Sequence, residues 1–213
     1  MSLIPRPTSG RGAVIELIVI VALAIGLAVA IQAVLVKPYQ IPSGSMLPTL
    51  EIGQRVLVNR IGHDLGDDPE IGDIVVFHPP LGAAREEQDH DHPLPECAVE
   101  RKPGQACPQA GSDEADTNFI KRVVAGPGDR VYIDHGHPVV NGVMAEEDFT
   151  APCGGGPDCN LPREITIPAD HYFMMGDNRG ASDDGRSWGP IPADWIIGQA
   201  FFTYWPPNRI GFL

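Results

Sequence analysis

The sequence predicts a mainly β protein, an antiparallel β-sheet domain carried on one N-terminal transmembrane helix. The first observation is that 24 glycines and 22 prolines among 213 residues separate short runs rich in β-branched residues. Such spacing is typical of strands joined by turns. The second is an apolar run at residues 17–36, whose one strongly polar residue is Gln32. About 20 apolar residues are enough to cross a bilayer as a helix.

The apolar run divides the chain into a tail at 1–16, the transmembrane helix at 17–36 and an extracytoplasmic domain at 37–213. Two alternatives fit less well. A cleaved signal peptide has an apolar run of about 7–15 residues and a small-residue cleavage site, whereas this run is longer and lacks such a site. A buried core helix would need other apolar segments around it. Because basic residues gather on the cytoplasmic side of a membrane helix, Arg6 and Arg11 place the tail in the cytoplasm.

Negative charge argues against one class of partner and marks one segment. The formal net charge is −13, so we expect no nucleic-acid partner. Residues 81–118 contain nine acidic residues against three basic ones, a local net charge of 3 − 9 = −6. Few apolar residues accompany them, so we expect a solvated, disordered insertion. The Asp-His-Asp-His cluster at 89–92 lacks further ligands at fixed spacing, so a polar loop is favoured there over a metal site.

Alternating apolar residues and turn signals predict the strands of the domain. Asn141-Gly142, between two apolar runs, is a strong hairpin signal. The other expected strands are 51–60, 71–78, 119–124, 130–134, 163–168 and 171–175. The aromatic-rich run at 200–207 fits either the core or a lipid interface. A chain of this length has room for one core with a small lobe, and we expect a monomer.

The stretch from Gln40 to Leu50, Gln-Ile-Pro-Ser-Gly-Ser-Met-Leu-Pro-Thr-Leu, holds the candidate nucleophile. Proline fixes φ and glycine permits conformations that other residues avoid, so the stretch is rigid and locally bent. A serine on such a bend, Ser43 or Ser45, exposes the hydroxyl and the backbone N–H groups that nucleophilic catalysis needs. An ordinary polar turn is the alternative for these residues alone.

A serine nucleophile needs a base, and the candidates are lysine and histidine. Lys121 shares one face of its predicted strand with Phe119 and Val123. Burial between apolar neighbours lowers the pKa of a lysine, as a lysine base requires. A lysine facing water from an edge strand fits the same spacing. A Ser-His-Asp triad with His78 or His171 as the base also remains open.

Three blocks of sequence occur together in this chain. They are Ser-Gly-Ser-Met-Leu-Pro-Thr-Leu at 43–50, Ile-Lys-Arg at 120–122 with Pro-Gly-Asp following, and Gly-Asp-Asn-Arg-Gly-Ala-Ser-Asp-Asp-Gly-Arg at 176–186. In this combination the sequence resembles the bacterial type I signal peptidases, the leader peptidase family with a Ser/Lys dyad. The resemblance also covers the anchor and the Tyr-Trp-Pro end. The third block departs from the common pattern at Gly180, Ala181 and Gly185.

The resemblance implies roles for individual residues. Ser45 is the implied nucleophile, with the Ser43 hydroxyl in the oxyanion hole, Lys121 as the general base and Ser182 orienting its amine. The residues implied to stiffen the site are Asp177, Asn178, Arg179, Asp184 and Arg186. The residues implied to line shallow substrate pockets are Ile41, Pro42, Met46, Leu50, Phe119 and Ile120.

The same resemblance implies a membrane-anchored serine endopeptidase that removes signal peptides from exported preproteins. Its substrates would carry small residues one and three positions before the scissile bond, the Ala-x-Ala pattern. Secreted preproteins and the lipid bilayer are then the partners, and no metal or organic cofactor is implied. Two alternatives remain: a specialised peptidase for a pilin-like or conjugation substrate, and a catalytically inactive, anchored binding module.

Four cysteines allow three disulfide connectivities. Cys153 and Cys159 flank Gly-Gly-Gly-Pro-Asp, a loop flexible enough to let them meet, and some members of the resembling family have a similar bridge. Cys97 then pairs with Cys107 by elimination. An oxidising exterior would keep both bridges intact, in agreement with an extracytoplasmic domain.

Overall fold

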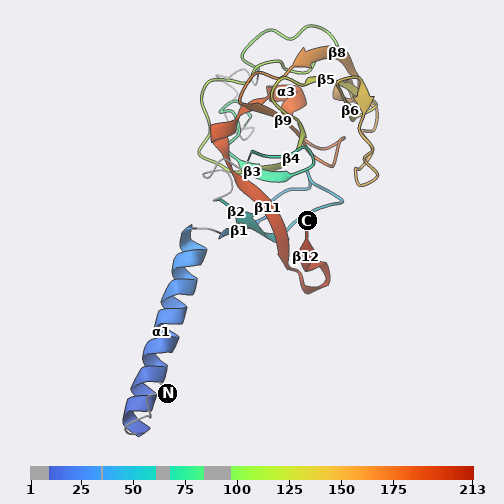
Figure 1. Ribbon diagram of the computed structural model, residues 1–213. Coiled ribbons are helices and arrows are strands. Elements are labelled where there is room, and N and C mark those ends of the chain that lie inside the picture. The colour runs from blue at the N-terminus through green and yellow to red at the C-terminus, as the bar shows by residue number, and fades with distance from the viewer. Residues whose placement is uncertain (1–9, 35, 61–67, 84–96) are drawn as a thin grey trace, which may run out of the picture.

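The computed structural model describes residues 10–34, 36–60, 68–83 and 97–213. Helix α1, Gly10–Val34, extends away from a body that contains all the strands (Figure 1). No proline interrupts the helix, and Pro38 follows soon after its end. Because α1 begins at Gly10, residues 10–16, expected as part of a tail, are helical. Residues 1–9 of that tail lie outside the described residues.

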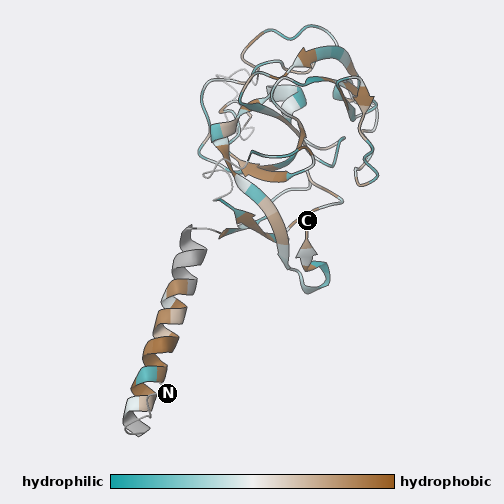
Figure 2. Cartoon of the chain, in the orientation of Figure 1, coloured by the Kyte–Doolittle hydropathy of each residue, from teal (hydrophilic) through white to brown (hydrophobic). Residues whose placement is uncertain are grey.

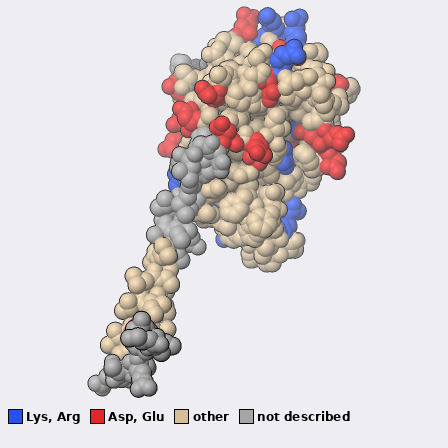
Figure 3. All heavy atoms as spheres, viewed as in Figure 1, with Lys and Arg blue, Asp and Glu red and all other residues tan. Residues whose placement is uncertain are grey.

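The described side chains of α1 are exposed and mostly apolar. Leu23 is 68% exposed and Ile15 is 62% exposed. Figure 2 shows hydrophobic residues along most of this helix, whereas the charged side chains in Figure 3 gather on the β body. Among the described residues, no helix combines the length and the apolar character that crossing a bilayer requires.

The larger sheet has eight strands, and all of them pair antiparallel, which confirms the predicted class. In spatial order they are β1 (Val36–Gln40), β2 (Arg55–Asn59), β11 (Ile196–Trp205), β3 (Ile74–Phe77), β4 (Phe119–Ala125), β9 (His171–Met175) and β10 (Ile191–Pro192), with β12 (Gly211–Phe212) paired to β11. All four residues of β3 are buried, as a continuous apolar run predicts. Strands β1, β10, β11 and β12 were not expected. β10 and β12 have only two residues each, β1 and β10 contain a proline, and the aromatic-rich run that overlaps β11 was not assigned to a strand.

The smaller sheet has the order β7 (Val143–Met144), β6 (His137–Val140), β5 (Arg130–Asp134) and β8 (Leu161–Thr166), again antiparallel. The predicted hairpin joins β6 to β7. Asn141 and Gly142 have φ values of 52° and 83°, the positive values that a type I′ turn requires and that Asn-Gly accepts. The short helices are η1 (Pro157–Cys159), α3 (Gly185–Trp188), η2 (Ala193–Trp195) and η3 (Pro207–Arg209).

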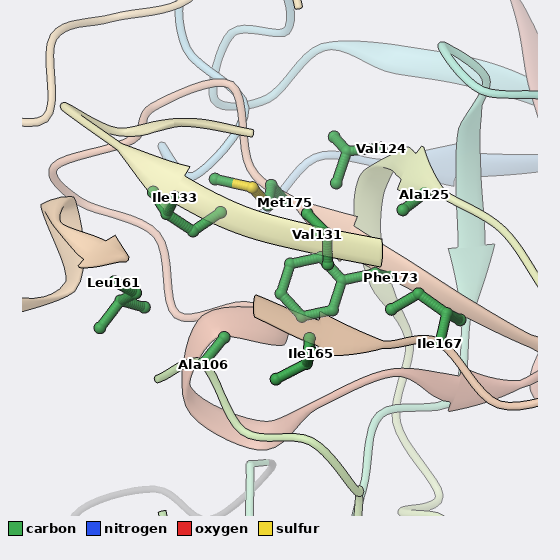
Figure 4. Packing of buried hydrophobic residues seen from close by; sticks show 10 residues of the cluster. All are labelled: Ala106, Val124, Ala125, Val131, Ile133, Leu161, Ile165, Ile167, Phe173 and Met175. Atoms are coloured by element: carbon green, nitrogen blue, oxygen red, sulfur yellow. The ribbon is translucent and has the colours of Figure 1, made fainter. Parts of the chain in front are cut away.

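One hydrophobic cluster joins the two sheets (Figure 4). Phe173 and Met175 enter it from β9, and Val131 and Ile133 enter it from β5; none of the four is more than 1% exposed. Burying one such side chain contributes about 1.5–3 kcal/mol. The cluster therefore fixes the smaller sheet against the strands of the larger sheet that surround the site.

The acidic segment differs from the expectation of a solvated insertion. Residues 84–96, which include the Asp-His-Asp-His cluster, lie outside the described residues. Residues 97–118 pack against the body: Ala106, Cys107 and Ala115 are at most 3% exposed, and Ala106 belongs to the cluster between the sheets. The expectation is thus wrong for this second half. The average composition of the segment is polar, but it includes a few small apolar residues. The Cys97–Cys107 disulfide and contacts with the β body bring these residues into the core.

Both expected disulfides are present. Cys97 bonds to Cys107 and Cys153 bonds to Cys159, and the Cα atoms of each pair are 5.7 Å apart. Each bridge closes a short loop on the β body. The pairing by elimination is therefore confirmed.

Candidate active site

The loop between β1 and β2 carries the candidate nucleophile. Its base is closed by two backbone hydrogen bonds, one from the Ile41 N–H to the Gln54 carbonyl and one from the Gly53 N–H to the Ile41 carbonyl, both 2.8 Å. Met46 and Leu50 are completely buried and hold the loop down. Ser45 is 9% exposed, so its hydroxyl lies in a largely enclosed setting at the top of the loop.

Lys121 on β4 reaches this serine. Its Nζ atom lies 2.9 Å from Ser45 Oγ, and its side chain is 4% exposed. The Phe119 ring centroid is 5.4 Å from the same nitrogen, and Val123, two residues further along β4, is completely buried. The buried interpretation of Lys121 is therefore confirmed. The face of β4 that carries the Lys121 side chain is the one directed at Ser45.

Burial lowers the pKa of Lys121 to about 8, although the charges of Asp184, Asp183 and Asp177 act to raise it. At a pKa of about 8, roughly a tenth of the amine is neutral at pH 7, compared with about 4 in 10,000 at the ordinary value. All three carboxylates belong to the 176–186 loop, so the fold brings this loop close enough to Lys121 for its charges to offset part of the effect of burial.

The histidine alternatives are placed differently. His78 Nδ1 lies 2.9 Å from the Thr117 carbonyl oxygen and 3.1 Å from that of Ala115. His171 Nδ1 lies 2.7 Å from the Ala169 carbonyl oxygen. Within the described part of the chain, no hydrogen bond joins either imidazole to Ser45. Lysine is therefore the basic side chain that this geometry pairs with the serine.

The two other serines of the expected site, Ser43 and Ser182, both lie near Ser45. Ser43 Oγ is 3.4 Å from Ser45 Oγ. Ser182 packs against Gly176, where a Cβ atom would overlap Ser182 Oγ and come within 2.5 Å of the Ser45 carbonyl oxygen. Only glycine fits there. The Ser182 hydroxyl donates to the Asp183 carbonyl oxygen at 3.4 Å, and the hydrogen bonds of the described residues include none between Ser182 and Lys121.

Asn178 holds the backbone of the serine loop. Its N–H donates to the Ser45 carbonyl oxygen at 3.0 Å, and its Nδ2 donates to the Gly44 carbonyl oxygen at 3.0 Å. These two bonds attach the 176–186 loop directly to the residue that carries the hydroxyl. The third sequence block therefore braces the first.

Asp177 ties three elements together from a completely buried position. Arg122, next to Lys121 on β4, donates through Nε at 2.9 Å and through a terminal nitrogen at 2.6 Å. Thr49 of the serine loop donates its hydroxyl to the same carboxylate at 2.5 Å. Sequence reasoning missed Arg122 and Thr49. Both lie inside the sequence blocks that carry the family resemblance. The opposite charges of Asp177 and Arg122 were the signal from which their pairing could have been predicted.

Asp184 and Arg186 form the other buried pair. The Asp184 carboxylate caps α3 and accepts from Arg186 Nε at 2.7 Å and from the Gly176 N–H at 3.0 Å. Complete burial acts to raise the pKa of Asp184, but the charge and hydrogen bonds of Arg186, helped by the Gly176 N–H, lower it below its usual value. Asp184 is therefore ionised and keeps the loop in place beside Lys121.

A cleft of about 490 Å³ opens beside the Ser45–Lys121 pair. Its lining residues are Pro42, Ser43, Gly44, Ser45, Thr117, Asn118, Phe119, Ile120, Lys121, Asn178, Ala181 and Asp183. Three of the expected pocket residues, Pro42, Phe119 and Ile120, are among them. The other three, Ile41, Met46 and Leu50, are at most 2% exposed and pack in a core cluster with Val56 and Val58. Across the described residues, no three His, Cys, Asp or Glu side chains converge as metal ligands would.

Comparison with known proteins identifies the same family that the three sequence blocks at 43–50, 120–122 and 176–186 resemble. Residues 14–205 match the family described as "Signal peptidase, peptidase S26". A probable signal peptidase I-2 from a Synechocystis species is 34% identical over 89% of this chain and 72% of its own length. A signal peptidase I from Leptolyngbya laminosa is 35% identical over 91% of this chain and 80% of its own. The thylakoidal processing peptidase 1 of Arabidopsis thaliana, a chloroplastic protein, is 33% identical over 88% of this chain, which spans 47% of that relative. The chain therefore belongs to the signal peptidases of peptidase family S26 and is a serine hydrolase.

Proposed function

We propose that this protein is a membrane-anchored endopeptidase that cleaves N-terminal signal peptides from exported preproteins, with Ser45 as nucleophile and Lys121 as general base. The observation that carries the proposal is the 2.9 Å approach of Lys121 Nζ to Ser45 Oγ in a buried setting beside a cleft. A base must lie within hydrogen-bond reach of the proton it removes. Family membership supplies the reaction class.

In the first half of the reaction, the neutral amine of Lys121 takes the proton of Ser45 as Oγ attacks the scissile carbonyl carbon. The resulting ammonium gives that proton to the departing amine, so the peptide bond breaks and an ester to Ser45 remains. A water molecule then attacks the ester, with the amine again accepting the proton. The proton returns to Ser45 Oγ when the ester bond breaks.

The oxyanion that forms at each attack needs donors in fixed positions. The Ser45 N–H and the Ser43 hydroxyl are the candidates, since Ser43 Oγ already lies 3.4 Å from Ser45 Oγ. Ser182 is proposed to orient the Lys121 amine when substrate fills the cleft. Its present hydrogen bond to Asp183, at 3.4 Å, is long, so turning the hydroxyl toward the amine gives up little.

Substrate choice is proposed to follow the Ala-x-Ala pattern. Pro42, Phe119 and Ile120 present apolar walls to the cleft, and Ile41, Met46 and Leu50 support those walls from behind. Apolar walls with a fixed backing accept small residues and exclude long polar ones. Asp177, Asn178, Arg179, Asp184 and Arg186 keep the facing loop rigid through the contacts described above.

The anchor is proposed to be residues 17–36, with the tail in the cytoplasm and the β body on the far side of the membrane. The apolar composition of that run and the exposed side chains of α1 support this arrangement. The two disulfides agree with an oxidising compartment.

The deciding experiment compares the purified wild type with Ser45→Ala on one preprotein whose cleavage site is read by mass spectrometry. The wild type should release the mature chain after a small residue and should be labelled at Ser45 by a serine-directed electrophile, whereas Ser45→Ala should do neither. Cleavage by Ser45→Ala would refute the nucleophile. Absence of both labelling and cleavage in the wild type would favour the inactive binding module, and cleavage confined to a pilin-like precursor would favour the specialised peptidase.

A further inference from the structure

Arg179 connects the 176–186 loop, called here the serine-bracing loop because Asn178 holds Ser45 in place, to the smaller sheet. Its guanidinium is 1% exposed and reaches three separate segments. Nε donates to the Gly176 carbonyl oxygen at 3.1 Å, within its own loop. One terminal nitrogen donates to the Gly136 carbonyl oxygen at 2.5 Å, in the turn between β5 and β6, and the other donates to Glu147 Oε1 at 2.6 Å.

Glu147 is the partner that neutralises this buried cation. Its side chain is 5% exposed, although it lies in the run Glu146-Glu147-Asp148, whose other two members are exposed. Its second carboxylate oxygen lies 3.2 Å from His137 Nδ1. A charge on Arg179 at this depth needs a charged, hydrogen-bonded partner. Among the described residues, Glu147 is the acidic side chain that forms an ion pair with it.

The chain around Glu147 reinforces the same attachment. The Thr150 hydroxyl donates to the Glu147 carbonyl oxygen at 3.0 Å and closes a turn. The next N–H along, that of Ala151, donates to the Asp177 carbonyl oxygen at 2.8 Å. Segment 147–151 therefore contacts the serine-bracing loop at two points, one on each side of Asn178.

We infer that Glu147 is a positioning residue for the nucleophile: through Arg179 it fixes Asn178, and Asn178 fixes Ser45. The path is short, since Arg179 follows Asn178 directly and the Asn178 N–H bonds to the Ser45 carbonyl oxygen at 3.0 Å. This inference rests on the proposed function, in which Ser45 is the nucleophile. Displacing a reacting group by about 1 Å can reduce a rate by about a hundredfold.

The expected consequence falls on kcat rather than on KM or on the pH profile. Seven of the twelve residues that line the cleft belong to the serine loop and β4. Among the described residues, the side-chain hydrogen bonds and ion pairs of Glu147 go to Arg179 and His137 and to neither of those two elements. The charges that set the pKa of Lys121 are those of Asp184, Asp183, Arg186 and Asp177. Loss of Glu147 should therefore slow the chemical step while leaving the pH at half-maximal activity unchanged.

The test compares Glu147→Gln with Glu146→Gln, an adjacent and exposed position where the same charge is removed. We expect kcat on a preprotein to fall about tenfold or more in Glu147→Gln with KM changed less than about threefold, and Glu146→Gln to match the wild type. Both are assayed below their measured unfolding temperatures. If Glu147→Gln does not fold, Glu147→Asp keeps the charge with a shorter side chain and should show a smaller fall in kcat.

A double variant and a control separate the explanations. If Glu147 acts through Arg179, Glu147→Gln combined with Arg179→Gln should be no slower than Arg179→Gln alone, because the two changes break one path. If the double variant instead loses kcat by the product of the two single losses, the inference is overturned. It is also overturned if Glu147→Gln has the same kcat as Glu146→Gln while Ser45→Ala is inactive. If Ser45→Ala cleaves the preprotein at the wild-type rate, the proposed nucleophile is wrong, and the inference about Glu147 falls with it.

Discussion

The Nζ atom of Lys121 lies 2.9 Å from the Oγ atom of Ser45, although 76 positions separate the two residues in the chain. Lys121 is placed by β4 in the middle of the larger sheet, and Ser45 by a loop whose apolar residues are anchored in the core. The contact therefore depends on long-range packing as much as on either motif.

Replacing Lys121 with arginine should abolish preprotein cleavage. Arginine keeps the positive charge but does not lose its proton at working pH, so it cannot serve as a base. Ser182→Ala should reduce kcat without eliminating it, because Ser182 is proposed to orient the amine and does not take the proton. Steady-state cleavage assays check both. Substantial turnover by Lys121→Arg would return His78 or His171 to consideration as the base.

Activity should rise with pH through a midpoint near 8, the pKa of Lys121, because the neutral amine is the active form. The charge of Asp183 raises that pKa, so Asp183→Asn should move the midpoint to lower pH. Asp148→Asn, an exposed change outside the charges that act on Lys121, is the matched control. Profiles of kcat/KM against pH measure the shift, and a midpoint that stays fixed in Asp183→Asn would contradict the electrostatic account.

Lys121→Met should make the protein inactive but more stable at neutral pH. The folded pKa of about 8 lies below the ordinary 10.5, so the unfolded chain holds more protons between these values and wild-type stability rises with pH there. Below pH 8 the buried ammonium costs about 3 kcal/mol, at about 1.4 kcal/mol per pKa unit. Denaturant unfolding at pH 7 and pH 10 should show the variant's advantage shrinking as pH rises. An advantage independent of pH would point to packing instead.

The two halves of the acidic segment should respond differently to deletion. Replacing residues 84–96 with a short Gly/Ser linker should leave cleavage within a few-fold of the wild type. Replacing 86–115 should destabilise the protein, because it removes buried Ala106 and the hydrogen bond from the Cys107 N–H to the Arg186 carbonyl oxygen at 3.0 Å. Thermal unfolding with a cleavage assay distinguishes the two. Equal stability of both variants would show that residues 97–115 contribute no core.

Membrane topology is tested by a reporter fused after Leu213. A reporter that is active only outside the cytoplasm should work in this fusion, since residues 17–36 are proposed to carry the β body across the bilayer. A fusion lacking residues 1–36 is the control and should lose that activity. Reporter activity on the cytoplasmic side would reverse the proposed orientation.

Local pattern was sufficient for several features of this protein. The Asn141-Gly142 turn follows from residues that accept positive φ. The alternation in β4 placed Lys121 on one face with Phe119 and Val123 but left open whether that face is buried. Strands β3 and β9 follow from short apolar runs. Each of these depends on interactions between near neighbours, which a sequence displays directly. The three sequence blocks likewise indicated the family, by resemblance.

Other features depended on how distant segments meet. Asp177 pairs with Arg122 across 55 positions and with Thr49 across 128, and Glu147 turns inward while its acidic neighbours stay exposed. The carboxylates beside Lys121, which hold its pKa near 8 against the effect of burial, are also brought there by the fold. Composition treats all acidic residues alike, whereas burial and Coulomb energy depend on distances that are set only when the sheets pack together.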